Sequence, residues 1–157
     1  MRKSLFFALL LGLSQSLLAQ APQEADKVAI QTVIDQLFDA MRANDSTMAA
    51  PLFHSAAQLT TVGGEAGAGK VGNLPYQRFV SAIGTPHDDV WDEKIANVKI
   101  LIDGNFAIAW MDFTFYLGEQ QLHCGVNMFR MLRTEAGWKI LGITDTRRTS
   151  GCLELKN

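Results

Sequence analysis

The chain has 157 residues, of which 48% are hydrophobic and 19% charged, and its formal net charge is −2 at pH 7. This length fits one domain with a single sizeable core. The sequence has no solenoid period and no low-complexity linker to a second domain. Because no basic stripe or basic tail is present, nucleic-acid binding has little electrostatic support.

The N-terminal segment has the pattern of a secretory signal peptide. A short positive segment precedes an apolar run over Leu5–Leu13, and Ala19–Ala21 forms an A-x-A cleavage site. The apolar run is shorter than the roughly 20 residues of a membrane span, although an uncleaved N-terminal anchor is the alternative. We predict a signal peptide over residues 1–21 and a single domain over residues 22–157. The exported domain, periplasmic or extracellular, is expected to have no membrane attachment and a net charge of −4, since the leader carries two positive residues.

Hydrophobic periodicity and turn residues predict the elements of this domain. Apolar residues from Val28 to Met41 recur near the helical period. Glycines at Gly104, Gly118 and Gly137 mark turns between runs rich in aromatic and β-branched residues. In chain order we predict helices over 23–44 and 47–50, a strand over 57–62, a helix over 75–83, and antiparallel strands over 90–102, 106–116, 121–131 and 138–148.

Residues 63–72 contain two motifs that resemble nucleotide-binding loops. The run Gly64–Lys70 fits the start of a P-loop, but Val71 stands where the Mg²⁺-binding Ser or Thr belongs. A Gly-x-Gly-x-x-Gly match begins at Gly67, but antiparallel strands follow it in place of a βαβ unit. We therefore interpret this segment as a flexible, glycine-rich connection between a strand and a helix.

The turn at Gly118 and Glu119 fixes a predicted register for the hairpin around it. Leu117 then faces Gln120, and the pairing carried along both strands places Thr114 opposite His123. Cross-strand partners share a face, and this register predicts one polar and aromatic face and one apolar face. The polar face holds Trp110, Asp112, Thr114, His123 and Asn127; the apolar face holds Ala109, Met111, Phe113, Phe115, Leu122, Cys124, Val126 and Met128. A slip of one residue would exchange these partners.

This polar face supplies the candidate catalytic residues, Asp112 and His123. Proton transfer needs a carboxylate or imidazole inside an apolar cavity, where burial brings its pKa toward neutrality. The alternative is that Asp112 lies on the outer surface and that His123 only forms a cross-strand hydrogen bond. The candidate ligand-binding residues are Trp110, which can stack on a planar ligand, and Thr114 and Asn127, which can orient a polar group. Asp145 and Arg147 can form an ion pair or an anion-binding site. His54 is a further candidate, and its alternative role is that of a structural histidine.

The remaining histidine, His87, and the two cysteines raise the questions of a metal site and of a disulfide. His87 lies beside two aspartates, but no second histidine stands at ligand spacing, so no metal site is predicted. Cys124 and Cys152 form a disulfide in an oxidising compartment, or remain a buried cysteine and a separate thiol on the tail. The sequence leaves both alternatives open.

The predicted domain resembles the nuclear transport factor 2-like (NTF2-like, or SnoaL-like) superfamily, and within it the branch called "putative lumazine-binding". The residues that carry the resemblance are Leu59–Thr61, Glu93–Ile95, Phe113–Gly118, His123–Asn127, Gly137–Ile140 and Asp145–Arg148. The resemblance implies an α+β cone, with N-terminal helices packed on a strongly curved antiparallel sheet. It also implies an apolar pocket and a homodimer formed through the sheet. It does not imply one activity, since the superfamily includes isomerases, cyclases, hydrolases, dehydratases and binding domains.

Two functions follow as expectations. The first is an exported binding or accessory domain that holds a small apolar or aromatic ligand, without catalysis and without a cofactor. The alternative is a cofactor-free lyase, isomerase or hydrolase that uses Asp112 or His123 as general base on a small hydrophobic substrate.

Overall fold

The computed structural model describes residues 9–155, and it describes side chains from residue 23 onward. The helices are α1 (Leu9–Arg42), α2 (Ser46–Ala49), the 3₁₀ helix η1 (Ala50–Leu52) and α3 (Tyr76–Ile83). The strands are β1 (Phe53–Glu65), β2 (Ala68–Pro75), β3 (Trp91–Asp103), β4 (Phe106–Leu117), β5 (Gln120–Thr134) and β6 (Gly137–Thr146). The start of the predicted signal peptide and all of its side chains lie outside the described residues, so the peptide stays a prediction. No described helix is long and apolar enough to cross a membrane.

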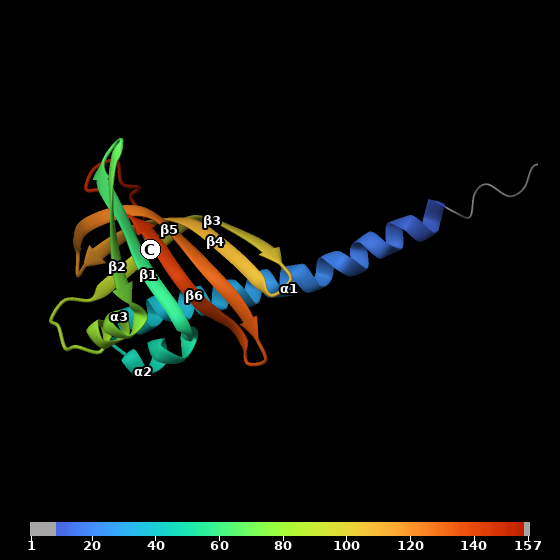
Figure 1. Cartoon of the computed structure of the whole chain (residues 1–157), viewed down its shortest axis with the longest axis horizontal. Coiled ribbons are helices and arrows are strands. Elements are labelled where there is room, and N and C mark those ends of the chain that lie inside the picture. The colour runs from blue at the N-terminus through green and yellow to red at the C-terminus, as the bar shows by residue number, and fades with distance from the viewer. Residues whose placement is uncertain (1–8, 156–157) are drawn as a thin grey trace, which may run out of the picture.

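The six strands form one curved sheet in the order β2-β1-β6-β5-β4-β3. The four strands from β3 to β6 are consecutive and antiparallel, as the sequence predicted, while β1 joins β6 in parallel. The register shifts in the β3–β4, β4–β5 and β5–β6 pairings, and such bulges bend a sheet. Figure 1 shows the sheet curving over the helices. The predicted α+β cone is confirmed.

The prediction of a flexible connection over residues 63–72 is wrong. Most of this segment is strand, because Gly64 pairs with Gly69 and Glu65 with Ala68 in an antiparallel β1–β2 hairpin. Gly67, with a φ of 81°, occupies its turn. Glycine has low strand propensity, which concealed β2 in the sequence. Since β2 and not a helix follows this turn, the arrangement of a P-loop is absent from the segment.

The core lies between the concave face of the sheet and the helices. The apolar stripe of α1 is almost completely buried against strands β3 to β6. The buried side chains of the core include Ile30, Ile34, Leu37 and Phe38 from α1 and Met111, Phe129, Met131 and Ile140 from the sheet. Figure 1 shows α1 running beneath the sheet, with α2 and α3 beside it at one end. The helices therefore close the cone on its concave side.

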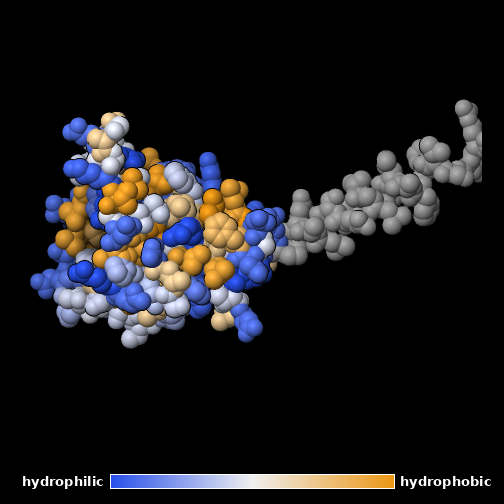
Figure 2. Space-filling view, in the orientation of Figure 1, coloured by the Kyte–Doolittle hydropathy of each residue, from blue (hydrophilic) through white to orange (hydrophobic). Residues whose placement is uncertain are grey.

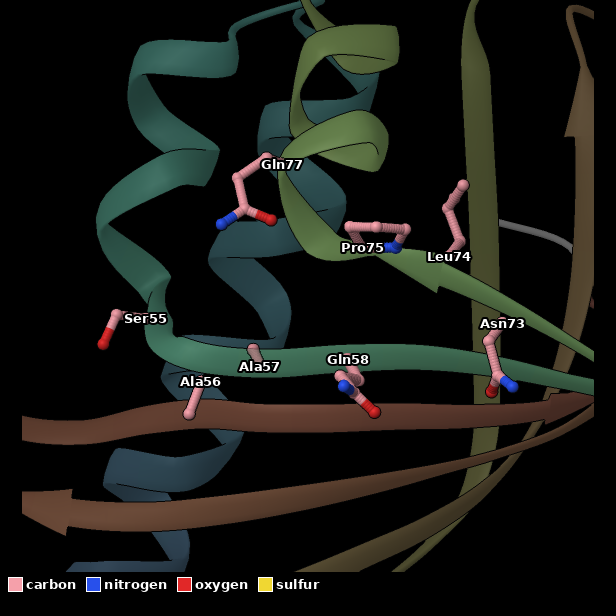
Figure 3. Close-up of a pocket in the computed structure, with 8 residues that line it drawn as sticks. All are labelled: Ser55, Ala56, Ala57, Gln58, Asn73, Leu74, Pro75 and Gln77. Carbon is pink, nitrogen blue, oxygen red and sulfur yellow. The ribbon is translucent and has the colours of Figure 1, made fainter.

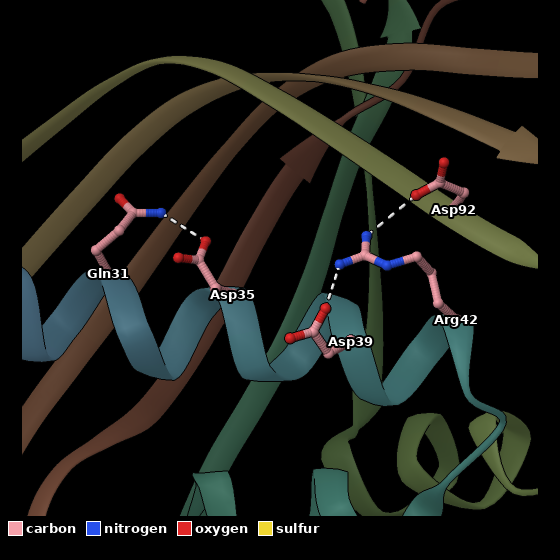
Figure 4. Close-up of polar contacts among 5 residues, drawn as sticks. All are labelled: Gln31, Asp35, Asp39, Arg42 and Asp92. Carbon is pink, nitrogen blue, oxygen red and sulfur yellow. Dashed lines mark hydrogen bonds and ion pairs between the residues drawn. The ribbon is translucent and has the colours of Figure 1, made fainter. Parts of the chain in front are cut away.

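Polar contacts hold α1 against the sheet at two places. Near its C-terminal end, Arg42 Nη1 lies 3.1 Å from Asp92 Oδ1 on β3, and the same guanidinium also pairs with Asp39 (Figure 4). Further toward its N-terminus, Asp26 accepts a hydrogen bond from Trp138 Nε1 at 3.2 Å. These contacts fix the position of the helix over the strands that line the cavity.

The predicted register of the β4–β5 hairpin is wrong beyond its first pairs. Leu117 faces Gln120 and Tyr116 faces Gln121, as expected from the turn, but Phe115 then faces His123. Leu122 is the extra residue of a β-bulge, and every later pair is displaced by one position. His123 and Asn127 therefore share the concave face with Phe113 and Phe115. The convex face carries Trp110, Asp112, Thr114, Cys124, Val126 and Met128, so the predicted polar and apolar faces are both mixed.

A disulfide pins the C-terminal tail to the convex face. Cys124 on β5 is bonded to Cys152, with the two Cα atoms 5.5 Å apart. This resolves the two alternatives that the sequence left open. The tail covers the buried Thr114, whose hydroxyl donates to the carbonyl of Leu153 at 2.9 Å. Arg148 adds backbone hydrogen bonds to Cys124 in both directions, each at 2.9 Å.

Candidate functional site

The concave face encloses a pocket with two connected parts. The inner chamber, of about 70 Å³, lies among core residues of α1 and the sheet. The outer chamber, of about 440 Å³, opens between α3, β3 and the end of β4. Met41, Phe79, Glu93, His123 and Arg147 line both chambers. A volume of this size fits a small organic molecule.

Glu93 carries a buried carboxyl group that lines both chambers of this pocket. Residues of β3 alternate across the sheet, so Glu93 points to the concave face together with Trp91 and Ile95, and its remaining accessible surface lines the pocket. Its Oε1 accepts a hydrogen bond from Nδ2 of the buried Asn127 at 2.5 Å. Burial raises the pKa of Glu93 from 4.5 to about 7, against the opposing effect of the Asn127 hydrogen bond. Glu93 can therefore hold or release a proton near neutral pH.

His123 lies on the same concave face as Glu93, two strands away, and its ring packs against two aromatic rings. Its ring centroid lies 5.8 Å from that of Phe113 and 5.1 Å from that of Phe115. Burial lowers the pKa of His123, and the positive charge of Arg147 lowers it further. Glu93 pairs with Phe115, which pairs with His123. The backbones of Glu93 and His123 are thus two strand spacings apart, about 10 Å, with Phe115 between them on the same face, and both side chains line the two chambers.

Asp145 and Arg147 form an ion pair at the same end of the pocket. Asp145 Oδ2 accepts from Arg147 Nε at 2.6 Å, and Oδ1 accepts from the hydroxyl of Thr61 at 2.6 Å. β1 runs parallel to β6 and brings Thr61 opposite Asp145. Both oxygens of Asp145 are thereby occupied, which fixes the orientation of the guanidinium.

The pocket brings together some of the residues predicted from the sequence and separates others. His123, Asn127, Asp145 and Arg147 line it. The prediction that Asp112 and His123 share a face is wrong, because the bulge at Leu122 places them on opposite faces; Asp112 instead accepts a hydrogen bond from Asn97 Nδ2 at 2.7 Å.

The other predicted ligand-binding residues lie outside the two chambers. Trp110 is 50% exposed on the convex face, and Thr114 is buried under the tail. His54 lies at the start of β1, where its Nδ1 accepts a hydrogen bond from the backbone of Ala56 at 3.2 Å. The convex position of Trp110 and Thr114 follows from the same displaced register.

Glu93 was missed as a site residue at the sequence level, although a signal for it was present. Trp91, Glu93 and Ile95 occupy alternate positions of a predicted strand, so a carboxylate stands between two large apolar residues on one face. That pattern indicates a carboxyl group held against an apolar surface. Only the fold shows that this surface is the pocket and that Asn127 reaches it from β5.

Gly125 allows the strand end that carries Arg147 to approach β5 closely. A Cβ atom at this position would overlap the carbonyl oxygen of Thr146 and lie 2.9 Å from the Phe113 ring. We expect Gly125→Ala to lower the free energy of unfolding by about 2 kcal/mol, since the backbone must shift to admit the methyl group. Urea unfolding measures this. The control is Gly63→Ala, where a Cβ meets nothing within 4 Å; equal losses in the two variants would contradict the expectation.

One further hollow on the described surface is less suited to acid–base chemistry. This hollow, between the β1–β2 hairpin and α3 and of about 370 Å³, is lined by Ser55, Gln58, Asn73 and Gln77 together with small apolar residues (Figure 3). It contains no titratable side chain. Within residues 9–155, no three His, Cys, Asp or Glu side chains are placed to hold a metal ion.

Comparisons with known proteins identify the fold. No protein-family model matches the sequence, and no curated protein matches it either. An NTF2-like protein of unknown function from Shewanella baltica is 24% identical, with a TM-score of 0.60, over 80% of this chain and 96% of its own. An NTF2-like protein with a cystatin-like fold from Novosphingobium aromaticivorans is 15% identical, with a TM-score of 0.70, over 87% and 91% of the two chains.

A third similar structure carries the name of an enzyme. It is called a putative scytalone dehydratase, also from Novosphingobium aromaticivorans, and is 12% identical, with a TM-score of 0.66, over 87% of this chain and 93% of its own. Identities at this level establish the architecture and leave the activity open. The chain therefore has the fold of NTF2-like proteins.

Proposed function

We propose that the protein is a cofactor-free lyase that binds a small hydrophobic molecule in the two chambers and eliminates water from it. The observation that carries this proposal is geometric: Glu93 and His123 both line both chambers, from positions separated by one strand. The similarity of the fold to a protein named as a putative dehydratase is consistent with this class of reaction.

The two side chains would divide the acid and base roles. Protonated Glu93 donates its proton to the leaving hydroxyl group, while neutral His123 removes a proton from the neighbouring carbon. The C–H and C–O bonds break, a C=C bond forms and water leaves, so no other reactant is needed. The raised pKa of Glu93, about 7, leaves a substantial fraction of it protonated near neutral pH, and the lowered pKa of His123 favours its neutral form there.

The test is a screen of small hydroxylated aromatic and alicyclic compounds for loss of water near pH 7. With an active compound in hand, kcat/KM should fall as the pH rises above about 7, where Glu93 ionises, and also at acid pH, where His123 is protonated. Glu93→Gln and His123→Ala should each lower kcat by about 10²-fold or more. Glu119→Gln, in the exposed β4–β5 turn, is the matched control. Full activity in Glu93→Gln would contradict the assignment.

Ligand binding without catalysis is the second candidate. It is favoured by the outer chamber, where apolar side chains make up most of the lining. In that case ligands bind but no compound in the screen is converted. Conversion of a bound compound therefore distinguishes an enzyme from a binding domain.

Three further expectations from the sequence remain proposals. Export is supported by the leader pattern over residues 1–21. A homodimer through the sheet is supported by the exposed side chains of Leu101, Phe106 and Trp110 on the convex face, and Figure 2 shows apolar patches among charged residues on the side of the body that it displays. Membership of the lumazine-binding branch rests on the sequence resemblance and is not extended to its ligand.

A further inference from the structure

The Arg147 guanidinium has hydrogen-bonding capacity left over for a ligand. Within the described residues it makes one hydrogen bond, from Nε to Asp145 Oδ2. The terminal nitrogens, Nη1 and Nη2, are uncommitted, the side chain is 55% exposed, and it lines both chambers. A planar guanidinium with free terminal N–H groups matches the two oxygens of a carboxylate.

The chain holds Arg147 from both sides along the backbone. Asp145 before it pairs with Asn127, and Arg148 after it pairs with Cys124, which carries the disulfide. Gly125 stands opposite and admits the close approach of Thr146. A guanidinium fixed in this way loses little freedom when a ligand binds, which favours recognition.

The remainder of the outer chamber suits an apolar ligand body. Its wall includes Leu74, Phe79, Trp91, Phe115, Leu117 and Leu122. Glu93, His123 and Arg147 are the titratable residues of this lining. The chamber, with a volume of about 440 Å³, thus combines a largely apolar wall with the cationic side chain of Arg147.

We infer that the ligand is a small carboxylate with an apolar or aromatic body, whose carboxylate is bound by Nη1 and Nη2 of Arg147. This inference rests on the proposed function, because it names the class of molecule that occupies the same pocket. The apolar body lies in the outer chamber, and the anionic group determines its orientation relative to Glu93 and His123.

Binding of such an anion is coupled to a proton on Glu93. The charges of Asp145 and Arg147 act on the Glu93 carboxyl in opposite directions, so a ligand charge at that end acts on it too. An added negative charge disfavours ionised Glu93, and the complex therefore takes up a proton near pH 7. Affinity for the carboxylate rises as the pH falls through this range.

Other titratable groups lie around Glu93. Asp35 and Arg42 reach the hollow beside Glu93 from α1, and Asp92 and Lys94 flank Glu93 on its own strand. His123, Asp145 and Arg147 face it from β5, β6 and the segment after β6. Because His123 also gains charge as the pH falls, Glu93→Gln is needed to separate the two contributions.

The experiment compares 4-phenylbutyrate with its neutral amide, 4-phenylbutyramide, by isothermal titration calorimetry. The wild-type protein should bind the carboxylate about tenfold more tightly than the amide. Arg147→Gln should remove this preference. Arg148→Gln, the adjacent arginine outside the chamber linings, should keep it. From pH 8 to pH 6.5 the affinity for the carboxylate should rise about threefold in the wild type, and the rise should be smaller in Glu93→Gln.

The outcomes separate this inference from the proposed function. Equal binding of both compounds to the wild type, or a preference retained in Arg147→Gln, overturns the carboxylate assignment and leaves an apolar binding pocket. Failure of both compounds to bind overturns the assignment together with the proposed pocket. Carboxylate selectivity without any dehydratase activity supports the inference and contradicts the catalytic proposal. Circular dichroism of each variant checks that the fold is intact.

Discussion

The Glu93→Gln variant is expected to be more stable than the wild-type protein above pH 7, by up to about 3 kcal/mol. The pKa of Glu93 is raised from 4.5 to about 7, chiefly by burial, and that rise corresponds to about 3 kcal/mol when the group is fully ionised. Glutamine has nearly the same shape and keeps an oxygen that can accept from Asn127 Nδ2. The substitution thus removes the cost of the buried charge and keeps the packing.

The pH dependence of this difference has a definite sign. A carboxyl group whose pKa is raised by folding keeps its proton in the native state after the unfolded chain has lost it. Wild-type stability therefore falls through this group as the pH rises from about 4.5 to about 7, and its contribution is constant above that range. The advantage of Glu93→Gln should be absent near pH 4, grow across this window and level off above it.

Urea unfolding at a series of pH values between 4 and 8.5 measures this difference directly. Subtracting wild-type from variant stability cancels the titration of groups that both proteins share, including His123. Glu119→Gln, in the exposed turn, should change stability by less than about 0.5 kcal/mol. A Glu93→Gln protein no more stable than wild type at pH 8, or a difference independent of pH, would show that Glu93 titrates normally.

A gain of stability in Glu93→Gln would indicate that the wild-type protein keeps a destabilising group in its pocket. Natural proteins retain costly groups where activity requires them, and neutral replacements there commonly gain stability and lose function. If Glu93→Gln is both more stable and inactive, the buried carboxyl group is explained by its chemistry. If the variant is more stable and binds ligands as before, the second candidate, a binding domain, is favoured.

The Cys152→Ser variant is expected to lose about 3 kcal/mol of stability. The disulfide joins residues 28 positions apart, and the loss of loop closure in the unfolded chain alone accounts for this magnitude. The variant also frees the tail that covers the buried Thr114, whose hydroxyl donates to Leu153. Beyond Thr146, the chain is then held to β5 by the backbone hydrogen bonds between Arg148 and Cys124.

Thermal unfolding with and without dithiothreitol tests this expectation. Reduction should bring the wild-type protein close to the stability of Cys152→Ser, and the variant itself should not respond to the reductant. Unchanged wild-type stability after complete reduction, checked by thiol titration, would show that the bridge contributes nothing. The same samples show whether release of the tail weakens carboxylate binding at Arg147.

Much of the architecture could be predicted from the sequence because its signals are local. The apolar period of α1, the turn at Gly104 and the hairpin around Gly118 each depend on residues close together in the chain. The structure confirms the strands β3 to β6 and their antiparallel order. The one missed strand, β2, lies where glycines obscure the pattern, and pairing with β1 stabilises it despite low propensity.

The candidate site was predicted only in part, and one residue accounts for the main error. Leu122 forms a bulge that displaces the β4–β5 pairing by one position, so His123 and Asn127 face the pocket while Asp112 faces outward. Strict alternation from a correctly identified turn cannot reveal an extra residue three positions after that turn. Because side chains alternate with a period of two, this single displacement exchanged the faces of half the hairpin.

The sequence by itself determined the helices, five of the six strands and the turns between the last four strands. Only the tertiary structure decided which polar groups meet, because Glu93 and Asn127, or Thr61 and Asp145, are joined by strand pairings between distant parts of the chain. The pKa of Glu93 is likewise a property of the assembled pocket. Local sequence gives the alternation of side chains along a strand, whereas the register that decides their face, and the burial and neighbouring charges that set their chemistry, exist only once the sheet has closed.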